Sequence, residues 1–264
     1  ARVREAAALW RDTAGLSDEV LARVIREDRI DILVDLAGHS AGNRLLVFAM
    51  KPAPIQVTAW GHAVGTGLGT IDYFFADPVV VPPEMRRYFS EEVVDLPSLV
   101  CYDPPDDAPE VGPPPALLRG HVTFGCLNRQ SKVSPKAVAL WAAILGALPD
   151  TRLLMKDEAF NEMSTGERLL GQLVSRGVDP ARVEFLGGSH RREHMAVYGR
   201  VDLVLDPFPH GGGVSALEGL WMGVPMVTLL GERIPARMGA SFLSTLGLAE
   251  LIAPTPERYV EIAV

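Results

Sequence analysis

The chain has 264 residues, 48% of them hydrophobic, and a formal net charge of −8, which indicates a globular protein with one large or two smaller α/β domains. The negative charge and the lack of a basic run argue against nucleic acid or a membrane surface as a partner. No apolar run reaches the ~18 residues of a membrane-spanning helix, and no signal peptide is recognisable. The two cysteines, Cys101 and Cys126, fit no metal-binding spacing and imply no disulfide, so we expect a cytoplasmic protein.

The first hundred residues predict a mixture of helices and strands. Ser17 is expected to cap a helix, because Asp18 and Glu19 follow in its first turn. The β-branched run from Ile30 to Leu36 indicates a buried strand. The other expected elements are helices over 1–14 and 44–50, strands over 55–59 and 73–76, and a partly extended segment over 90–99.

Two histidines of this half follow glycines in loops that begin near the end of a predicted strand. His39 lies in the loop 38–43, and His62 lies in the Gly-rich loop 60–69. An imidazole in such a loop could act as a general base or contact a sugar. A structural role is commoner for a lone histidine, and neither has a nearby acid in the sequence.

The segment 102–115 has the composition of a linker between domains. It contains six prolines and four acidic residues, a combination that does not favour regular structure. The alternative is a solvated surface loop within one domain.

The second half predicts a regular succession of strands and helices. Ser134 followed by Pro135 is a helix start, and Ser164-x-x-Glu167 has the spacing of a capping box. Expected strands are 122–126, 152–155, 183–186, 203–205 and 226–230, and further helices are expected near 191–199, 214–222, 237–246 and after Thr255. Strands that alternate with helices in this way predict a doubly wound parallel sheet, in which ligands bind at the carboxyl ends of the strands.

The stretch 202–228 combines a strand, a turn with three glycines, a short helix and a second strand. This βαβ arrangement is typical of phosphate-binding sites, because the first amides of the helix have no partner within it and point at the ligand. Glu218 follows one helical turn after Val214 and Ser215, where its carboxylate could accept two ribose hydroxyls. The alternative is a tight turn with Glu218 in solvent, since Gly-rich loops are common.

Two further loops carry charged residues at predicted strand ends. Lys132 follows the strand 122–126 and could reach a phosphate as a point charge, although a surface lysine is the commoner case. Arg191 and His194 lie one helical turn apart and could grip a flat base, or they could belong to the charged first turn of a solvated helix.

A zinc site is a remote alternative. His190-x-x-Glu193-His194 fits the HxxEH signature of a class of zinc peptidases. That motif needs both histidines on one helix and a third ligand, whereas His190 lies in a Gly-Gly-Ser loop and no third ligand is evident.

Three stretches resemble one known family. They read LVDLAGHSAGNRLLVFAMKPAPIQV, GCLNRQSKVSP and LDPFPHGGGVSALEGLWMGVPMVTLLGE. In this order they are similar to the catalytic region of protein O-GlcNAc transferase and its SPINDLY-like relatives, and the match runs from about Ile30 to Val264. The resemblance implies two Rossmann-like lobes of the GT-B type and inverting transfer of a sugar, GlcNAc foremost, from a UDP- or GDP-linked donor to Ser or Thr of proteins. It implies no metal and no cofactor.

The resemblance also implies roles for individual residues, residue by residue. Lys132 matches the family's diphosphate-binding lysine, and Arg129 takes the place of a polar donor-binding residue. Ser189, His190 and Arg191 match the segment that borders the base, and His194 matches a histidine that packs near it. Gly213, Val214 and Ser215 stand where the family often has His-Thr-Thr, whose amides and hydroxyls hold the diphosphate, and Glu218 matches the ribose-binding acid. The departure to Gly-Val-Ser removes side-chain donors but keeps the amides.

The expected organisation follows from the same resemblance. Residues 1–101 form a partial N-terminal lobe on the acceptor side, 102–120 a Pro-rich linker, and 121–264 the nucleotide-sugar-binding lobe. Tetratricopeptide repeats are expected upstream in the full-length protein, together with the first part of an incomplete N-lobe. The leading hypothesis is therefore a protein glycosyltransferase, with Lys132, His39 and His62 as catalytic candidates. The alternatives are a nucleotide-sugar-binding domain without turnover and, more remotely, the zinc hydrolase.

Overall fold

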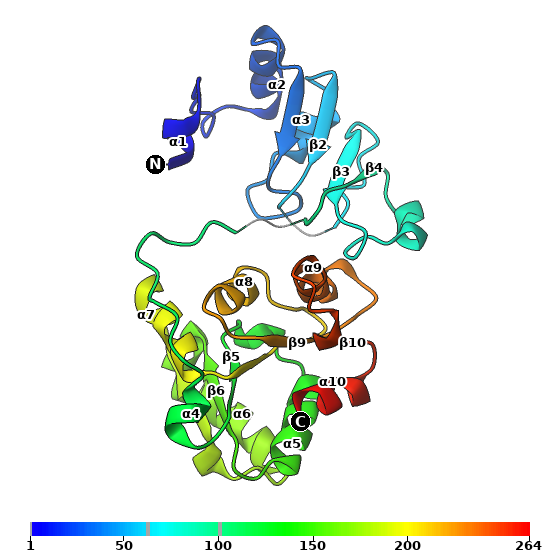
Figure 1. Ribbon diagram of the computed structural model, residues 1–264. Coiled ribbons are helices and arrows are strands. Elements are labelled where there is room, and N and C mark those ends of the chain that lie inside the picture. The colour runs from blue at the N-terminus through cyan, green and yellow to red at the C-terminus, as the bar shows by residue number, and fades with distance from the viewer. Residues whose placement is uncertain (1, 62–63, 100–101) are drawn as a thin grey trace. The chain divides into compact units, whose positions relative to one another are not determined.

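The computed structural model describes residues 2–61, 64–99 and 102–264. The chain forms two compact α/β units, Ala1–Leu99 and Val100–Val264 (Figure 1). Segment 102–120, predicted as a linker, therefore falls within the second unit. No helix among the described residues is long and apolar enough to cross a membrane.

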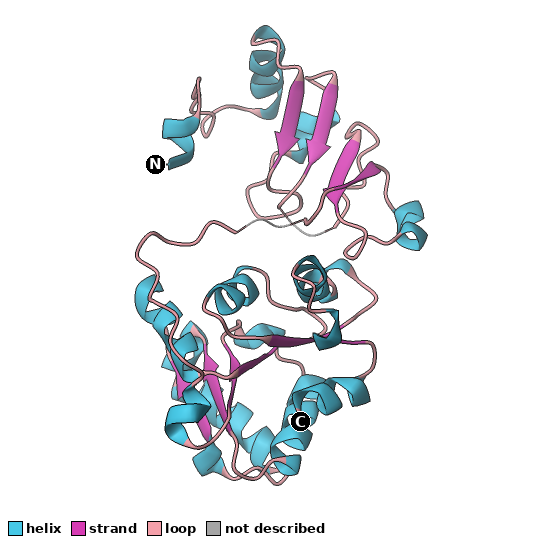
Figure 2. Ribbon diagram, viewed as in Figure 1, coloured by secondary structure: helices cyan, strands magenta, loops and turns pink. Residues whose placement is uncertain are grey.

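The first unit is a sheet of four parallel strands in the order β1-β2-β3-β4, shown in magenta in Figure 2. The strands are β1 (Ile32–Asp35), β2 (Ile55–Thr58), β3 (Tyr73–Ala76) and β4 (Glu92–Asp95), and the helices are α1 (Arg2–Ala6), α2 (Asp18–Glu27) and α3 (Leu45–Ala49). Ser17 caps α2 as predicted, because its Oγ accepts from the backbone N of Val20 at 3.3 Å.

Two expectations for the first unit are wrong. The helix predicted over 1–14 ends at Ala6, and Leu9 and Trp10 beyond it are exposed, so no buried apolar stripe supports a longer helix. β1 is not a buried strand either, since Ile32 is 56% exposed and Val34 40%. The reason is its place at the edge of the described sheet, where β2 is its partner strand.

The second unit is the doubly wound parallel sheet that the sequence predicts. Its strands are β5 (Thr123–Cys126), β6 (Arg152–Lys156), β7 (Val183–Leu186), β8 (Leu203–Leu205), β9 (Met226–Leu229) and β10 (Ile252–Ala253). Its helices are α4 (Pro115–Arg119), α5 (Pro135–Ala147), α6 (Met163–Val174), α7 (Arg191–Ala196), α8 (Val214–Trp221), α9 (Met238–Thr245) and α10 (Pro256–Ala263). The strand order is β10-β9-β8-β5-β6-β7, so the winding direction reverses between β5 and β8. Such a reversal opens a crevice at the carboxyl ends of the two strands.

Apolar clusters cover both faces of this sheet. Leu153 belongs to the cluster beneath α5, α6 and α10, and Leu154 belongs to the cluster beneath α7, α8 and α9. This division follows from the alternation of side chains along a strand. Because helices cover both faces, a ligand can reach this sheet only at the ends of its strands, where the loops lie.

Residues 102–120 run along the second unit. Ala108 packs against the second of these clusters, and the ring of Tyr102 lies 6.3 Å from that of Trp221. The backbone N of Ala116 donates to Asp202 Oδ1 at 2.8 Å. Residues 102–114 thus follow an irregular path, as expected, and α4 begins at Pro115, but the path follows the surface of this unit.

The helix starts of this unit test two cap predictions. Ser134 caps α5, with its Oγ 3.2 Å from the backbone N of Ala137. The capping box predicted at Ser164 is wrong, because α6 begins at Met163 and its N-cap Glu162 makes no side-chain cap bond. Ser164 is therefore already inside the helix.

Candidate functional site

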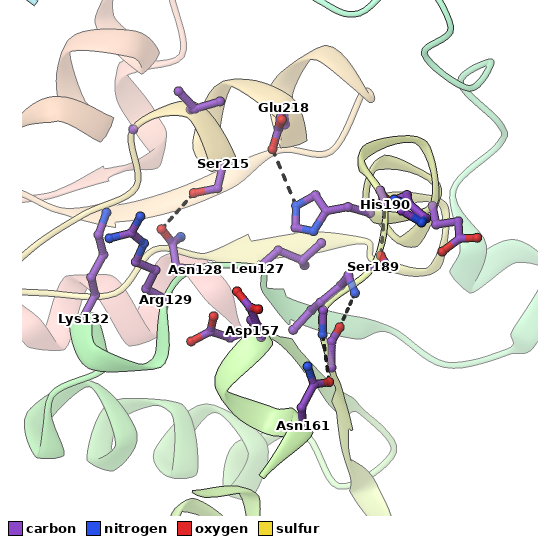
Figure 3. A pocket seen from close by; sticks show the side chains of 18 of the residues that line it. Leu127, Asn128, Arg129, Lys132, Asp157, Asn161, Ser189, His190, Ser215 and Glu218 are labelled. Atoms are coloured by element: carbon purple, nitrogen blue, oxygen red, sulfur yellow. Dashed lines mark hydrogen bonds and ion pairs between the residues drawn. The ribbon is translucent and has the colours of Figure 1, made fainter. Parts of the chain in front are cut away.

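A pocket of about 1060 Å³ opens at the carboxyl edge of the second unit. It is lined by the loop after β5, the end of β6, the loop after β7 and the first turns of α8 (Figure 3). These are the loops in which ligands of doubly wound sheets bind, and they flank the reversal of strand order between β5 and β8. Apart from Arg191, the second-unit residues predicted to bind the donor all line this pocket.

Lys132 lies at the end of a short 3₁₀ helix, Gln130–Lys132, which follows β5. Its Nζ donates a hydrogen bond of 2.8 Å to the carbonyl oxygen of Gly211. Burial lowers the pKa of the Lys132 ammonium, and the charge of Asp206 acts in the opposite direction. Arg129, three residues earlier, lines the same part of the pocket (Figure 3). Two cationic side chains thus lie in one part of the pocket, and Lys132 contacts the Gly-rich turn.

Asp206, the residue after β8, holds that turn from within. Its Oδ1 accepts from the backbone N of Gly212 at 2.7 Å, and its Oδ2 accepts from Thr228 Oγ1 at 2.7 Å. Burial raises the pKa of the Asp206 carboxyl to about 6. A Cβ on Gly211 would lie 2.7 Å from Asp206 Oδ2, so this glycine permits the close approach. Sequence analysis did not assign Asp206 to the site.

The start of α8 faces the pocket without a protein cap. Gly213 is its N-cap residue and offers no side-chain hydrogen bond, so the first amides of the helix lack that partner. A Cβ on Gly213 would meet no protein atom within 4 Å, which leaves the approach to the helix start open. Ser215 Oγ donates to Asn128 Oδ1 at 2.8 Å, so this hydroxyl is already engaged. Val214 also lines the pocket and is exposed.

Glu218 lies one turn further along α8 and is buried, with 7% of the residue exposed. Its carboxylate is 3.7 Å from Arg191 Nε and 3.5 Å from His194 Nε2. Arg191 does not line the pocket and instead meets Glu218 from α7. The arrangement presents to the pocket a carboxylate that is flanked by two nitrogen-bearing side chains.

The far side of the pocket is formed by the loop after β7. Ser189 and His190 line it, and His190 is the N-cap residue of α7. Asn161 Oδ1 accepts from the backbone N of Gly188 at 3.2 Å, and Lys156 Nζ donates to the carbonyl oxygen of Gly187.

Sequence analysis did not assign several polar residues that line the pocket, namely Asn128, Lys156, Asp157, Glu158, Asn161 and His210. Lys156 is the last residue of β6, so the carboxyl-end rule that identified Lys132 could have found it.

The zinc alternative gains no support from the geometry. His190 precedes the first helical residue of α7, so the motif does not lie on one helix. The described residues contain no group of three or more His, Cys, Asp or Glu side chains that could hold a metal ion.

The catalytic candidates of the first unit stand apart in the chain from the pocket lining. His39 lies in the loop after β1, which Asp35 holds by accepting from the backbone N of Ala37 at 3.0 Å and of Gly38 at 2.9 Å. His62 lies outside the described residues. The described pocket lining belongs wholly to the second unit.

Comparison with known proteins identifies one family. A family model described as glycosyl transferase family 41 matches residues 13–101 and 116–264. The probable UDP-N-acetylglucosamine–peptide N-acetylglucosaminyltransferase SPINDLY of Oryza sativa is 41% identical over 265 residues, and the similarly named SEC of Arabidopsis thaliana is 32% identical over 276 residues. Each alignment covers 100% of this chain, but only 29% and 28% of those relatives.

The solved structures agree with the fold. A mutant of the Thermobaculum terrenum O-GlcNAc transferase superposes with a TM-score of 0.94 at 39% identity, covering 99% of this chain and 50% of that one. A sucrose-phosphate synthase from Thermosynechococcus elongatus matches with a TM-score of 0.56 at 11% identity, over 93% of this chain and 72% of that one, which shows a shared fold alone. The two parallel sheets thus correspond to the GT-B arrangement.

Proposed function

The chain belongs to glycosyl transferase family 41, and we propose that it transfers a sugar from a nucleoside diphosphate donor to Ser or Thr hydroxyls of proteins. The observation that carries the proposal is the second-unit pocket, with Lys132 and the uncapped start of α8 at one end and the buried Glu218 beyond them. A cation and free helix amides suit a diphosphate, and a carboxylate suits vicinal ribose hydroxyls.

The proposed chemistry is a direct displacement. The acceptor oxygen forms a bond to the anomeric carbon while the bond from that carbon to the diphosphate oxygen breaks, which inverts the anomeric centre. The leaving diphosphate gains negative charge in the transition state, and Lys132 and the first amides of α8 stabilise it. The acceptor hydroxyl loses its proton to a general base, for which His39 and His62 are the candidates.

We propose GlcNAc as the sugar and UDP as the carrier, because the relatives in rice and Arabidopsis are named for UDP-GlcNAc. GDP-linked donors are the competing substrates. The protein acceptor, a cytoplasmic location and upstream tetratricopeptide repeats are part of the same proposal.

The test is transfer of radiolabelled GlcNAc from UDP-GlcNAc to a Ser/Thr-containing peptide by the protein and by Lys132→Met. The proposal predicts labelled peptide with the wild type and loss of label with the variant. The matched control is Lys136→Met, which makes the same change at an exposed lysine of α5.

A second candidate, binding of a nucleotide sugar without turnover, is favoured by one observation. The described pocket lining lies wholly in the second unit, so this unit by itself offers a place for the donor. Bound UDP-GlcNAc without labelled peptide would select this candidate over transfer.

A further inference from the structure

Lys156 is a buried lysine that the proposed mechanism does not use. It is the last residue of β6, it is 4% exposed, and it lines the pocket. The register pairs Lys156 with Leu186 at the end of β7, which brings its side chain beside Gly187. A lysine this deeply buried is uncommon unless its charge has partners.

The hydrogen bonds of Lys156 are incomplete within the part of the chain that the structure describes. An ammonium has three N–H donors, and Nζ donates to the carbonyl oxygen of Gly187. Burial lowers the pKa of the Lys156 ammonium, while the charge of Glu193 acts in the opposite direction. Two donors therefore remain for an acceptor in the pocket, and buried donors without an acceptor are unfavourable.

The position of Lys156 in the pocket indicates which part of a bound ligand would accept its hydrogen bond. In Figure 3, Lys132 and Arg129 lie at the left, Ser189 lies at the right and Asn161 lies below, and Glu218 lies above them near the centre. Asn161 and Lys156 both hold the loop after β7, through Gly188 and Gly187. On the proposed function, a nucleotide with its diphosphate at Lys132 and its ribose at Glu218 places its base against this loop.

We propose that Lys156 determines base specificity by donating a hydrogen bond to the C4 oxo oxygen of uracil or the C6 oxo oxygen of guanine. Cytosine carries an amino group at C4 and adenine carries one at C6. An amino group is itself a donor there, so it would leave the buried ammonium without an acceptor. The site therefore selects UDP over CDP, or GDP over ADP.

A purely structural role for Lys156 predicts something different. If the Lys156 side chain only held the loop through Gly187, its loss would lower the affinity for every nucleotide by a similar factor. A specificity role changes the ratio between an oxo nucleotide and its amino counterpart. That ratio is the readout that separates the two roles.

The experiment is calorimetric titration of the wild type, Lys156→Met and the surface control Lys136→Met with UDP, CDP, GDP, ADP and inorganic pyrophosphate. We expect the wild type to bind UDP at least about 10-fold more tightly than CDP, or GDP at least about 10-fold more tightly than ADP. This factor corresponds to the contribution of one charge-assisted hydrogen bond. Lys156→Met should abolish this preference and leave pyrophosphate affinity unchanged. Lys136→Met should alter neither quantity.

Two results overturn the inference. They are equal wild-type affinity within both nucleotide pairs, and a preference that stays unchanged in Lys156→Met, whether or not all nucleotides lose affinity together. If Lys156→Met does not fold, Lys156→Gln takes its place with the same ratios as the readout, because a neutral amide can donate or accept and should not discriminate within a pair. A wild type that binds neither nucleotide nor pyrophosphate overturns the proposed function as well, whereas binding without discrimination removes only the role of Lys156.

Discussion

The Lys132 ammonium donates to the carbonyl oxygen of Gly211 at 2.8 Å, although the two residues are 79 positions apart in the sequence. The contact joins the loop after β5 to the turn after β8, the two strands between which the sheet order reverses. The order of the strands therefore places the Lys132 ammonium at the Gly-rich turn. Asp206 fixes the same turn by accepting a hydrogen bond from the backbone N of Gly212.

Replacing Lys132 by methionine should weaken binding of UDP or GDP by roughly 10- to 150-fold, because a charge-assisted contact contributes about 1.5–3 kcal/mol. The loss should be similar for inorganic pyrophosphate, since the contact is assigned to the diphosphate. Calorimetry measures both, with Lys136→Met as the control. Unchanged affinity in the Lys132 variant would return this residue to a structural role.

Gly213→Val should reduce diphosphate binding more than Ser215→Ala does. A Cβ at Gly213 meets no protein atom within 4 Å, but the branched side chain would obstruct the helix amides. The Ser215 hydroxyl already donates to Asn128, and its loss leaves the amides in place. Titration of both variants, after circular dichroism shows them folded, gives the order. The opposite order would place the diphosphate elsewhere.

Glu218→Gln should lower affinity for nucleotide and leave affinity for pyrophosphate nearly unchanged. The carboxylate is assigned to ribose hydroxyls, which pyrophosphate lacks, and an amide accepts fewer hydrogen bonds than a carboxylate. The variant also removes the charge that faces Arg191 and His194. Equal losses of affinity for both ligands would mean that Glu218 contributes to binding the diphosphate and not the ribose.

Asp206 should make the stability of the protein depend on pH. Its folded-state pKa of about 6 lies above the ordinary value of 3.8, so between these values the folded state binds more protons than the unfolded state. The free energy of unfolding should therefore fall as pH rises from about 4 to about 6 and change little from this group outside that window. The size is on the order of 3 kcal/mol.

Asp206→Asn isolates this contribution, because an amide of the same shape does not titrate. Urea unfolding of both proteins at intervals from pH 4 to pH 7 gives the difference in free energy. That difference should shift in favour of the variant as pH rises through the window. Parallel pH profiles for the two proteins would contradict the pKa assigned to Asp206.

Much of the fold follows from local sequence patterns. Strand β7 occupies the predicted residues, β3 does as well, and the cap at Ser134 starts α5 where expected. β10 was not predicted as a strand, because its two residues are too few to show a period. The exposure of β1 could not be predicted either, since a β-branched run shows nothing about which strands lie beside it.

The site was predictable only in part, for a similar reason. Lys132, Glu218 and the Gly-rich turn adjoin strand ends, and that position is visible in the sequence. Lys156 also adjoins a strand end and could have been identified in the same way, but its place beside the loop after β7 depends on the pairing of β6 with β7, which is a property of the tertiary structure. The pairing of Arg191 with Glu218 likewise depends on how α7 and α8 meet.

The central claim is that the second-unit pocket binds a nucleoside diphosphate sugar through Lys132 and the start of α8. Calorimetric titration of the wild type with UDP-GlcNAc, UDP, GDP-fucose and GDP tests it most directly, with Lys132→Met and Gly213→Val alongside. The account predicts saturable binding of one donor and its nucleotide, competed by pyrophosphate and weakened in both variants. Absence of binding by all four ligands, or binding that both variants leave intact, would contradict it.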